Sequence, residues 1–446
     1  MRDIALALFI FGMIPFILMR PYVGLLVWSW LGYMNPNRLC FGFAVNFPWV
    51  QLVAIVTLVS LAFSKDRKKI PMSALSVLLF LFLTWTGITT FFAVVPDSAW
   101  DKWSQFAKVL IMVFVTLMLV DRRERMHWLV WMIVVSIGFY GVKGGAFTIL
   151  HGGTNHVLGP AKSFIADNND LAQALCMVLP LMRYLQLQAS KKAVRVGLTL
   201  AMLLTGVGIL GTYSRGGLIA LAVVSAALFL KSRKRIAVIV VVGMLGFTAY
   251  HFMPPQWTER MNTLHHADEV NSAQTRIQSW KFATNVALHR PLIGGGFDVY
   301  ESPAMWERYG PDGAKVRAVH SIYFRVLGEQ GFLGLALYLA LLITSWRSCS
   351  GIRKRTRDSP KHKWAYDLGS MLQVSLLAYM TAGLATTSSY FDLSYQLMAM
   401  CALLSIIVAN ESSGLGAHEW AGNASSEIGR KQLLMAHKHH EQQIPE

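Results

Sequence analysis

Charged residues are scarce in this chain. Only 15% of its 446 residues are Asp, Glu, Lys or Arg, and 54% are hydrophobic, whereas a typical soluble domain carries about 25% charged residues. This shortage argues against a soluble fold. Apolar runs long enough to cross a bilayer recur along the sequence, and they are continuous rather than alternating, which is typical of membrane-spanning helices and not of barrel strands. We therefore expect an all-α, polytopic membrane protein.

Cysteine is also rare, and metal-binding patterns are missing. The four cysteines are scattered without a CxxC pair, so the sequence carries no disulfide framework. There is no Asp-x-Asp pair in the segments expected outside the membrane and no His-x-x-x-His helix, so we expect neither a metal ion nor another cofactor. The net charge of +17 is divided among short basic clusters between apolar runs. We therefore expect membrane lipids as neighbours and no nucleic-acid partner.

The order of apolar runs and basic clusters predicts the topology. Basic clusters near residues 65–69, 122–125, 191–195, 231–235 and 353–363 recur after every second run, so they lie on one side, which the positive-inside rule assigns to the cytoplasm. We expect about 12 transmembrane helices with both termini in the cytoplasm and residues 22–34 short and partly interfacial. In the alternative, residues 4–19 and 22–34 both span and the N-terminus lies outside. The apolar runs are residues 4–19, 22–34, 48–63, 73–95, 106–120, 129–149, 170–188, 196–213, 217–230, 236–253, 331–346, 368–389 and 394–409.

One long segment between apolar runs differs from the others. Residues 254–330 contain eight Lys or Arg and eight Asp or Glu, and a loop of this length crosses the membrane regardless of its charge. It has helical periodicity around residues 275–288, and such long loops are uncommon unless they fold or function. We expect four parts: N-terminal transmembrane helices (1–253), a large periplasmic loop with amphipathic helices (254–330), C-terminal transmembrane helices (331–409) and a disordered cytoplasmic tail (410–446).

Three residues expected on the outer side are candidates for chemistry, because charge near a membrane is costly. Arg215 lies in Ser214-Arg215-Gly216, a break between two runs; a guanidinium binds phosphate oxygens in pairs, and glycine lets a ligand approach the backbone. Arg276 opens the amphipathic stretch, and two arginines from separate segments suit a diphosphate. His320 can accept a proton near neutral pH. The structural alternatives are a snorkelling anchor for Arg215, a solvated face for Arg276 and a packed, non-catalytic His320.

A polar cluster, Asp167-Asn168-Asn169-Asp170, precedes the run 170–188. It is the nearest approach to a metal site that the outer segments offer. Asn and Asp are also preferred at helix N-caps, so the simpler expectation is that this cluster caps the helix that follows.

Five motifs follow one another in the second half of the chain. They are Ser214-Arg215-Gly216, Arg276 with Trp280, His289-Arg290-Pro291-Leu292-Ile293-Gly294-Gly295-Gly296, His320-Ser321 and Leu327-Gly328-Glu329-Gln330-Gly331. Taken together, these motifs resemble the O-antigen ligase and polymerase superfamily over roughly residues 150–410. Asn169 before Leu171-Ala172 matches a further common element. The N-terminal part, from Met1-Arg2-Asp3-Ile4 through Met34-Asn35-Pro36, resembles the exosortase A-associated O-glycosylation ligase branch.

The resemblance implies a membrane glycosyltransferase of the C-type architecture. Its donor would be a glycan on undecaprenyl diphosphate at the periplasmic face of the bacterial inner membrane, and transfer would be inverting and independent of metal. Arg215 and Arg276 would hold the diphosphate, and His320 would activate the acceptor hydroxyl. Supporting roles would fall to Arg260, Arg317 and Asn169.

The acceptor remains open at this point. The superfamily favours lipid A–core, as in an O-antigen ligase, whereas the N-terminal resemblance favours a protein O-glycosylation ligase, and an O-antigen polymerase would use the same site. A polysaccharide or lipid transporter is the alternative from another class. A transporter would carry charged or broken helices near the membrane midplane, and apart from Arg183 the apolar runs contain almost no charge.

Overall fold

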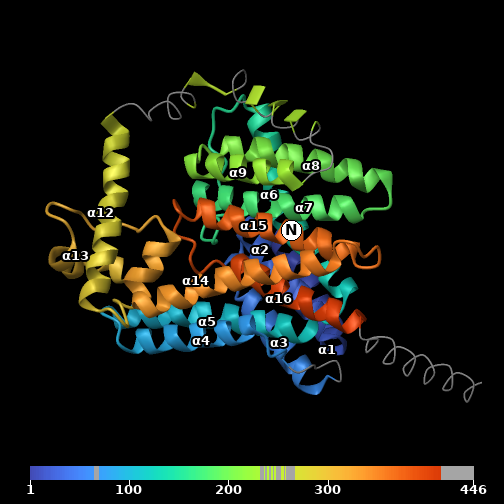
Figure 1. The fold of residues 1–446 in the computed structure, drawn as a ribbon, viewed down its shortest axis with the longest axis horizontal. Helices are drawn as coiled ribbons and strands as arrows, with labels where there is room; N and C mark the ends of the chain where they lie inside the picture. Colours follow the sequence, from blue (N-terminus) through green and yellow to red (C-terminus); the bar gives the residue numbers. More distant parts are fainter. Residues whose placement is uncertain are drawn as a thin grey trace, which may run out of the picture.

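The computed structural model describes residues 1–64, 70–231 and 267–412, together with scattered positions between 236 and 257. Every regular element in these ranges is helical (Figure 1), which confirms the all-α prediction. The helices are α1 (Arg2–Met19), α2 (Pro21–Met34), α3 (Trp49–Phe63), α4 (Ala74–Phe91), α5 (Pro96–Leu119), α6 (Arg123–Leu150), α7 (Asn168–Gln188), α8 (Lys192–Gly211), α9 (Arg215–Lys231), α12 (Ala267–His289), α13 (Pro303–Tyr309), α14 (Ile322–Thr356), α15 (Lys363–Ala382) and α16 (Asp392–Ser412).

Seven of the described helices are long and apolar enough to cross a membrane, namely α1, α4, α5, α6, α8, α14 and α16. The chain is therefore a multi-pass membrane protein. Helix α3 is apolar but shorter, and α2, with 14 residues, rises only about 21 Å against a hydrocarbon core of about 30 Å. The expected run 236–253 falls largely outside the described residues, so the number of about 12 spans stays a prediction.

Helices α7, α15 and α16 form the buried centre of the bundle. In α16, 83% of the apolar stretch is buried, against 17% in α1. The central helices carry polar side chains because neighbouring helices supply hydrogen-bond partners in place of water. Gln396 on α16 bonds Thr116 on α5 at 3.2 Å, and Gln173 on α7 donates to the carbonyl of Tyr379 on α15 at 3.2 Å.

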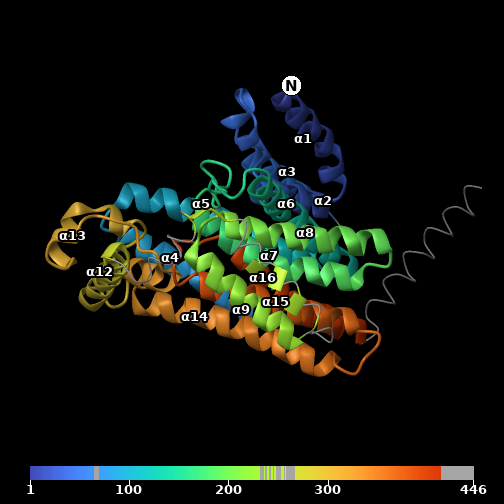
Figure 2. The same cartoon turned by 90° about the horizontal axis from the view of Figure 1, so that it is seen from above.

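The helices run between two polar ends. At one end, the start of α6, the end of α7 and the start of α15 meet, since Arg123 donates to Gln188 at 3.4 Å and Gln188 donates to Asp367 at 3.1 Å. We call this the basic end, because the described arginine and lysine clusters lie here. At the other end, the backbone N–H of Val94 donates to Gly295 at 2.9 Å. Helices α12 and α13 lie at this second end, on the left of Figures 1 and 2, and we call it the loop end.

The direction of α2 bears on the two topologies expected for residues 4–34, both of which stay predictions. The hydroxyl of Tyr22, at the start of α2, donates to the carbonyl of Arg125 at the basic end, and the hydroxyl of Tyr140, further along α6, donates to the carbonyl of Met34 at the end of α2. Arg125 and Tyr140 are separated by about 22 Å of helix. Helix α2 therefore runs from the basic end toward the loop end beside α6, which agrees with the alternative in which both segments span. Figure 2 shows α1 and α3 leaning away from the other helices.

Helices α14 and α15 also depart from the apolar runs that predicted them. Helix α14 begins at Ile322, before the run 331–346, and is kinked at Gly331, where φ is +70°. A side chain is excluded there, because a Cβ would lie 2.2 Å from the carbonyl oxygen of Leu292. Helix α15 ends at Ala382, and residues 383–391, which the apolar run included in part, form a non-helical segment that we call the 383–391 loop.

Candidate functional site

The starts of α7 and α9 are joined by side-chain hydrogen bonds at the loop end. Asn168 donates to the carbonyl of Thr212 at 2.9 Å, and the hydroxyl of Ser214 donates to the amide oxygen of Asn169 at 2.7 Å. The same Ser214 oxygen accepts from the backbone N–H of Gly217 at 3.0 Å and so caps α9. Arg215, the first residue of α9, is thereby fixed in position.

Asp167 supplies the matching cap on α7. Its carboxylate accepts from the backbone N–H of Asn169 at 2.8 Å and from the side-chain amide of the same residue at 3.0 Å. This confirms the expectation that the acidic cluster caps a helix. Asn169 therefore links the cap of α7 to the residue that precedes Arg215.

Two glycines let α9 approach its neighbours closely. A Cβ on Gly217 would lie 2.5 Å from that of Ala172 on α7, and a Cβ on Gly216 would lie 3.0 Å from that of Ala385 in the 383–391 loop. Larger residues would push the start of α9 away from both. Packing alone is therefore a sufficient reason for glycine at positions 216 and 217, whether or not a ligand binds there.

Arg276 approaches the same place from α12. Four residues, or about one helical turn, further along α12, the ring of Trp280 stacks on Phe324 of α14, with centroids 5.0 Å apart, and so fixes α12 against α14. Arg276 is partly buried. Burial lowers its pKa, and the positive charge of Arg215 lowers it further. The structure therefore brings the two arginines together from separate segments.

His320 completes the group just before α14. Burial lowers the pKa of its imidazole, and the charge of Arg276 lowers it further, whereas the carboxylate of Asp167 acts in the opposite direction. The imidazole is therefore largely neutral at pH 7 and able to accept a proton. Arg276 thus interacts with both Arg215 and His320, and Asp167 interacts with His320, so these four residues gather at the loop end.

The supporting roles expected for Arg260 and Arg317 stay predictions. The guanidinium of Arg317 donates to the carbonyl of Lys315 at 3.0 Å, which is a bond within its own turn. Arg260 lies outside the described residues. Among the residues that the structure does describe, no group of three or more His, Cys, Asp and Glu side chains is placed to hold a metal ion.

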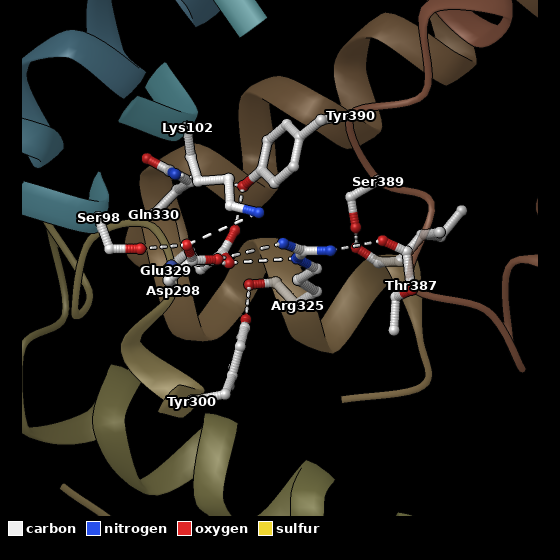
Figure 3. A network of polar contacts seen from close by, with 11 residues as sticks. Ser98, Lys102, Asp298, Tyr300, Arg325, Glu329, Gln330, Thr387, Ser389 and Tyr390 are labelled. Atoms are coloured by element: carbon white, nitrogen blue, oxygen red, sulfur yellow. Dashed lines mark hydrogen bonds and ion pairs between the residues drawn. The ribbon is translucent and has the colours of Figure 1, made fainter. Parts of the chain in front are cut away.

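A buried ion network that the sequence did not reveal joins α14 to α5 and to the segment between α12 and α13 (Figure 3). Arg325 on α14 pairs with Glu329 at 3.1 Å and with Asp298 at 3.7 Å. The side chains of Glu329 and Asp298 are only 0% and 4% exposed. Asp298 also faces Lys102 on α5 at 3.9 Å, and Tyr390 donates to Glu329 at 2.6 Å.

The network and its neighbours hold the 383–391 loop. Arg325 donates to the backbone carbonyl of Thr387 at 2.7 Å. The hydroxyl of Tyr395 donates to the backbone carbonyl of Ser389 at 2.9 Å. The N–H of Ile322, the first residue of α14, donates to the carbonyl of Gly383 at 2.8 Å. Irregular backbone near a membrane needs such internal partners. The loop therefore connects the start of α14, beside His320, to the start of α9, beside Arg215.

Two family models match parts of this chain. Residues 200–339 match the O-antigen ligase family (Wzy_C). This part of the chain is an O-antigen ligase domain, which supports a place in the O-antigen ligase superfamily. Residues 1–190 match a family of unknown function (DUF5935), and a comparison with curated proteins gave no match. Arg215, Arg276 and His320 lie in the O-antigen ligase domain, whereas Asp167 and Asn169 lie in the first domain, so both domains build the site.

The O-antigen ligase domain indicates the general activity. The protein transfers glycan in the manner of a ligase or polymerase, from a lipid-linked glycan to an acceptor. It is thus a glycosyltransferase-like enzyme of the membrane.

Proposed function

We propose that this O-antigen ligase superfamily member transfers a polysaccharide from undecaprenyl diphosphate to an acceptor hydroxyl of lipid A–core at the periplasmic face of the inner membrane. The observation that carries the proposal is the convergence of Arg215, Arg276 and His320 from separate segments at the loop end. This end lies opposite the basic end, which the positive-inside rule assigns to the cytoplasm.

The chemistry follows from the charges of these residues. The diphosphate leaving group gains negative charge as the glycosidic bond breaks, and two fixed guanidinium groups stabilise that charge more strongly in the transition state than in the ground state. His320 takes the proton of the acceptor hydroxyl as the oxygen attacks the anomeric carbon. A single base is sufficient for a direct, inverting displacement without a metal ion.

A complementation experiment tests the proposal. In a strain lacking the gene, the wild-type protein should restore long-chain glycan on its acceptor, whereas His320→Ala should accumulate glycan on undecaprenyl diphosphate. Surface-glycan profiles and extracted lipid-linked glycan are the measurements. Glycan found on protein or on a longer lipid-linked polymer would instead identify a protein ligase or a polymerase. Full restoration by His320→Ala would remove the histidine from the mechanism.

Asp167→Asn tests the role of the histidine by pH. Asparagine caps a helix as well as aspartate does, but the change removes a negative charge that raises the pKa of His320. The pKa of His320 should fall, so the base stays neutral to lower pH and the acidic limb of the kcat/KM profile moves to lower pH. Asp312→Asn changes an exposed carboxylate in the segment between α13 and His320. This control should leave the acidic limb of the kcat/KM profile in place. An upward shift in Asp167→Asn would contradict the assignment.

Cysteine labelling tests the orientation. The four native cysteines are buried, so a new exposed cysteine can be labelled selectively. Phe41→Cys, between α2 and α3, should react with a membrane-impermeant maleimide on spheroplasts, whereas Arg20→Cys, at the basic end, should react only after permeabilisation. Labelling of Arg20→Cys on intact spheroplasts would favour the topology in which residues 4–34 span once.

A further inference from the structure

A cavity opens at the basic end, at the opposite end of the bundle from the site formed by Arg215, Arg276 and His320. It measures about 590 Å³ and lies between the junction of α1 and α2 and the start of α6. Arginines line its polar part and apolar side chains line the rest, which is the composition expected around an amphiphilic ligand. The lining residues used below are Arg20, Val23, Leu26, Arg122, Arg125 and Trp128.

Arg125 is a buried lining residue of this cavity, and its guanidinium interacts with neighbouring groups of the protein. It is 8% exposed, donates to the carbonyl of Leu119 at 2.8 Å, pairs with Asp121 at 3.4 Å and lies 5.2 Å over the ring of Tyr22. Its position joins α2, α5 and α6. Arg125 therefore shapes the cavity, while its charge is largely committed to the protein.

The two other arginines keep their charge available to a ligand. The side chain of Arg122 is 49% exposed, and its ion pair with Asp121 is long, at 3.9 Å. Arg20 is exposed at the break between α1 and α2. Among the described residues that line the cavity, Glu124 is the single carboxylate and three are arginines. The balance is positive, so the cavity favours an anion.

The apolar walls identify the kind of anion. Val23 and Leu26 are partly buried along α2, and the indole of Trp128 is 60% exposed on α6. A free phosphate gains nothing from such walls, whereas a phospholipid places its acyl chains along them and its phosphate near the arginines. Exposed tryptophan is also typical of the membrane interface, where lipid head groups begin.

We propose that this cavity binds an anionic phospholipid of the cytoplasmic leaflet. Arg20 and Arg122 contact the phosphate, and Val23, Leu26 and Trp128 contact the acyl chains. Basic pockets between transmembrane helices on this side of the membrane suit such head groups. The site lies at the opposite end of the bundle from the diphosphate site, so its ligand is a resident lipid and not the glycan donor.

Lipid titration followed by native mass spectrometry tests the proposal. The full-length protein in detergent is titrated with phosphatidylglycerol and, separately, with phosphatidylcholine. Arg20→Gln/Arg122→Gln should bind phosphatidylglycerol about 30-fold more weakly than wild type, because each basic side chain near the head group contributes about fivefold. Wild-type protein should prefer phosphatidylglycerol to phosphatidylcholine.

A matched variant separates a site from general positive charge. Arg355→Gln/Arg357→Gln removes the same charge from exposed positions of the basic end and should bind phosphatidylglycerol as wild type does. Equal weakening in both double variants, or none in the first, would overturn the proposal. So would displacement of the lipid by millimolar inorganic phosphate, because that result would identify a free-phosphate site. The near-UV circular dichroism of both variants should match wild type, since the four side chains are exposed or half-exposed.

Discussion

Arg276→Ala should lower the rate of glycan transfer by about 10²- to 10³-fold, the usual cost of removing one group that stabilises transition-state charge. The guanidinium of Arg276 lies near that of Arg215 and near His320, so its loss removes half of the positive charge facing the proposed diphosphate. The fold should survive, because the ring of Trp280 still packs α12 against α14. Single-turnover transfer from purified lipid-linked glycan is the measurement.

Two further variants make that result specific. Arg276→Lys keeps the charge but loses the planar pair of donors, so it should recover only part of the rate. Arg308→Ala, at an exposed arginine of α13 that stacks on its neighbour Tyr309 at 5.3 Å, should transfer at the wild-type rate. The double variant Arg215→Ala/Arg276→Ala should be less impaired than the product of the two single effects, because groups that act as a unit are not additive. Wild-type rates in Arg276→Ala would eliminate the clamp.

The central residues of the site could be predicted because each places a charged or titratable group beside an apolar run, where such a group is energetically unfavourable. Arg215 sits in a short polar break between apolar runs, and His320 precedes a span directly. Permanent or titratable charge in such places needs a reason. Their mutual proximity could not be predicted from the residues alone, since it depends on how α9, α12 and α14 pack.

The complete ion network could not be predicted either, because it also depends on tertiary packing. The spacing of Arg325 and Glu329, four residues apart on one helix, was a readable signal for an ion pair. Asp298 gave no such signal, because it reaches Arg325 only through the turn at residues 294–296, whose Gly294 and Gly296 adopt positive φ angles of 61° and 80°. Long-range pairing of this kind is fixed by tertiary structure.

The fold shows a similar division. Apolar length predicted helices correctly, since every span must satisfy its own backbone. Helix ends were predicted less well, because side chains from distant segments replace the missing backbone partners. Helix α15 ends at Ala382 although the apolar run continues, and Arg325 and Tyr395 satisfy carbonyls of the 383–391 loop. The direction of α2 likewise depended on a contact between Tyr22 and Arg125 that hydropathy does not encode.

Arg325→Met should destabilise the protein by about 3–5 kcal/mol, the usual cost of leaving a buried charge without its partner. The change keeps an apolar stem but removes the cation between Glu329 and Asp298, whose side chains are 0% and 4% exposed. It also removes the donor to the carbonyl of Thr387. Thermal unfolding of the detergent-purified protein should therefore shift to clearly lower temperature.

The second variant of the pair distinguishes electrostatics from packing. Arg325→Met/Glu329→Gln removes the orphaned carboxylate, while glutamine can still accept the hydrogen bond that Tyr390 donates at 2.6 Å. Asp298 keeps Lys102 at 3.9 Å. The double variant should therefore be more stable than Arg325→Met alone, since a buried ion pair replaced on both sides costs much less than one broken on a single side. Additive losses would mean that Arg325 acts by filling space and by holding the 383–391 loop, and not by compensating buried negative charge.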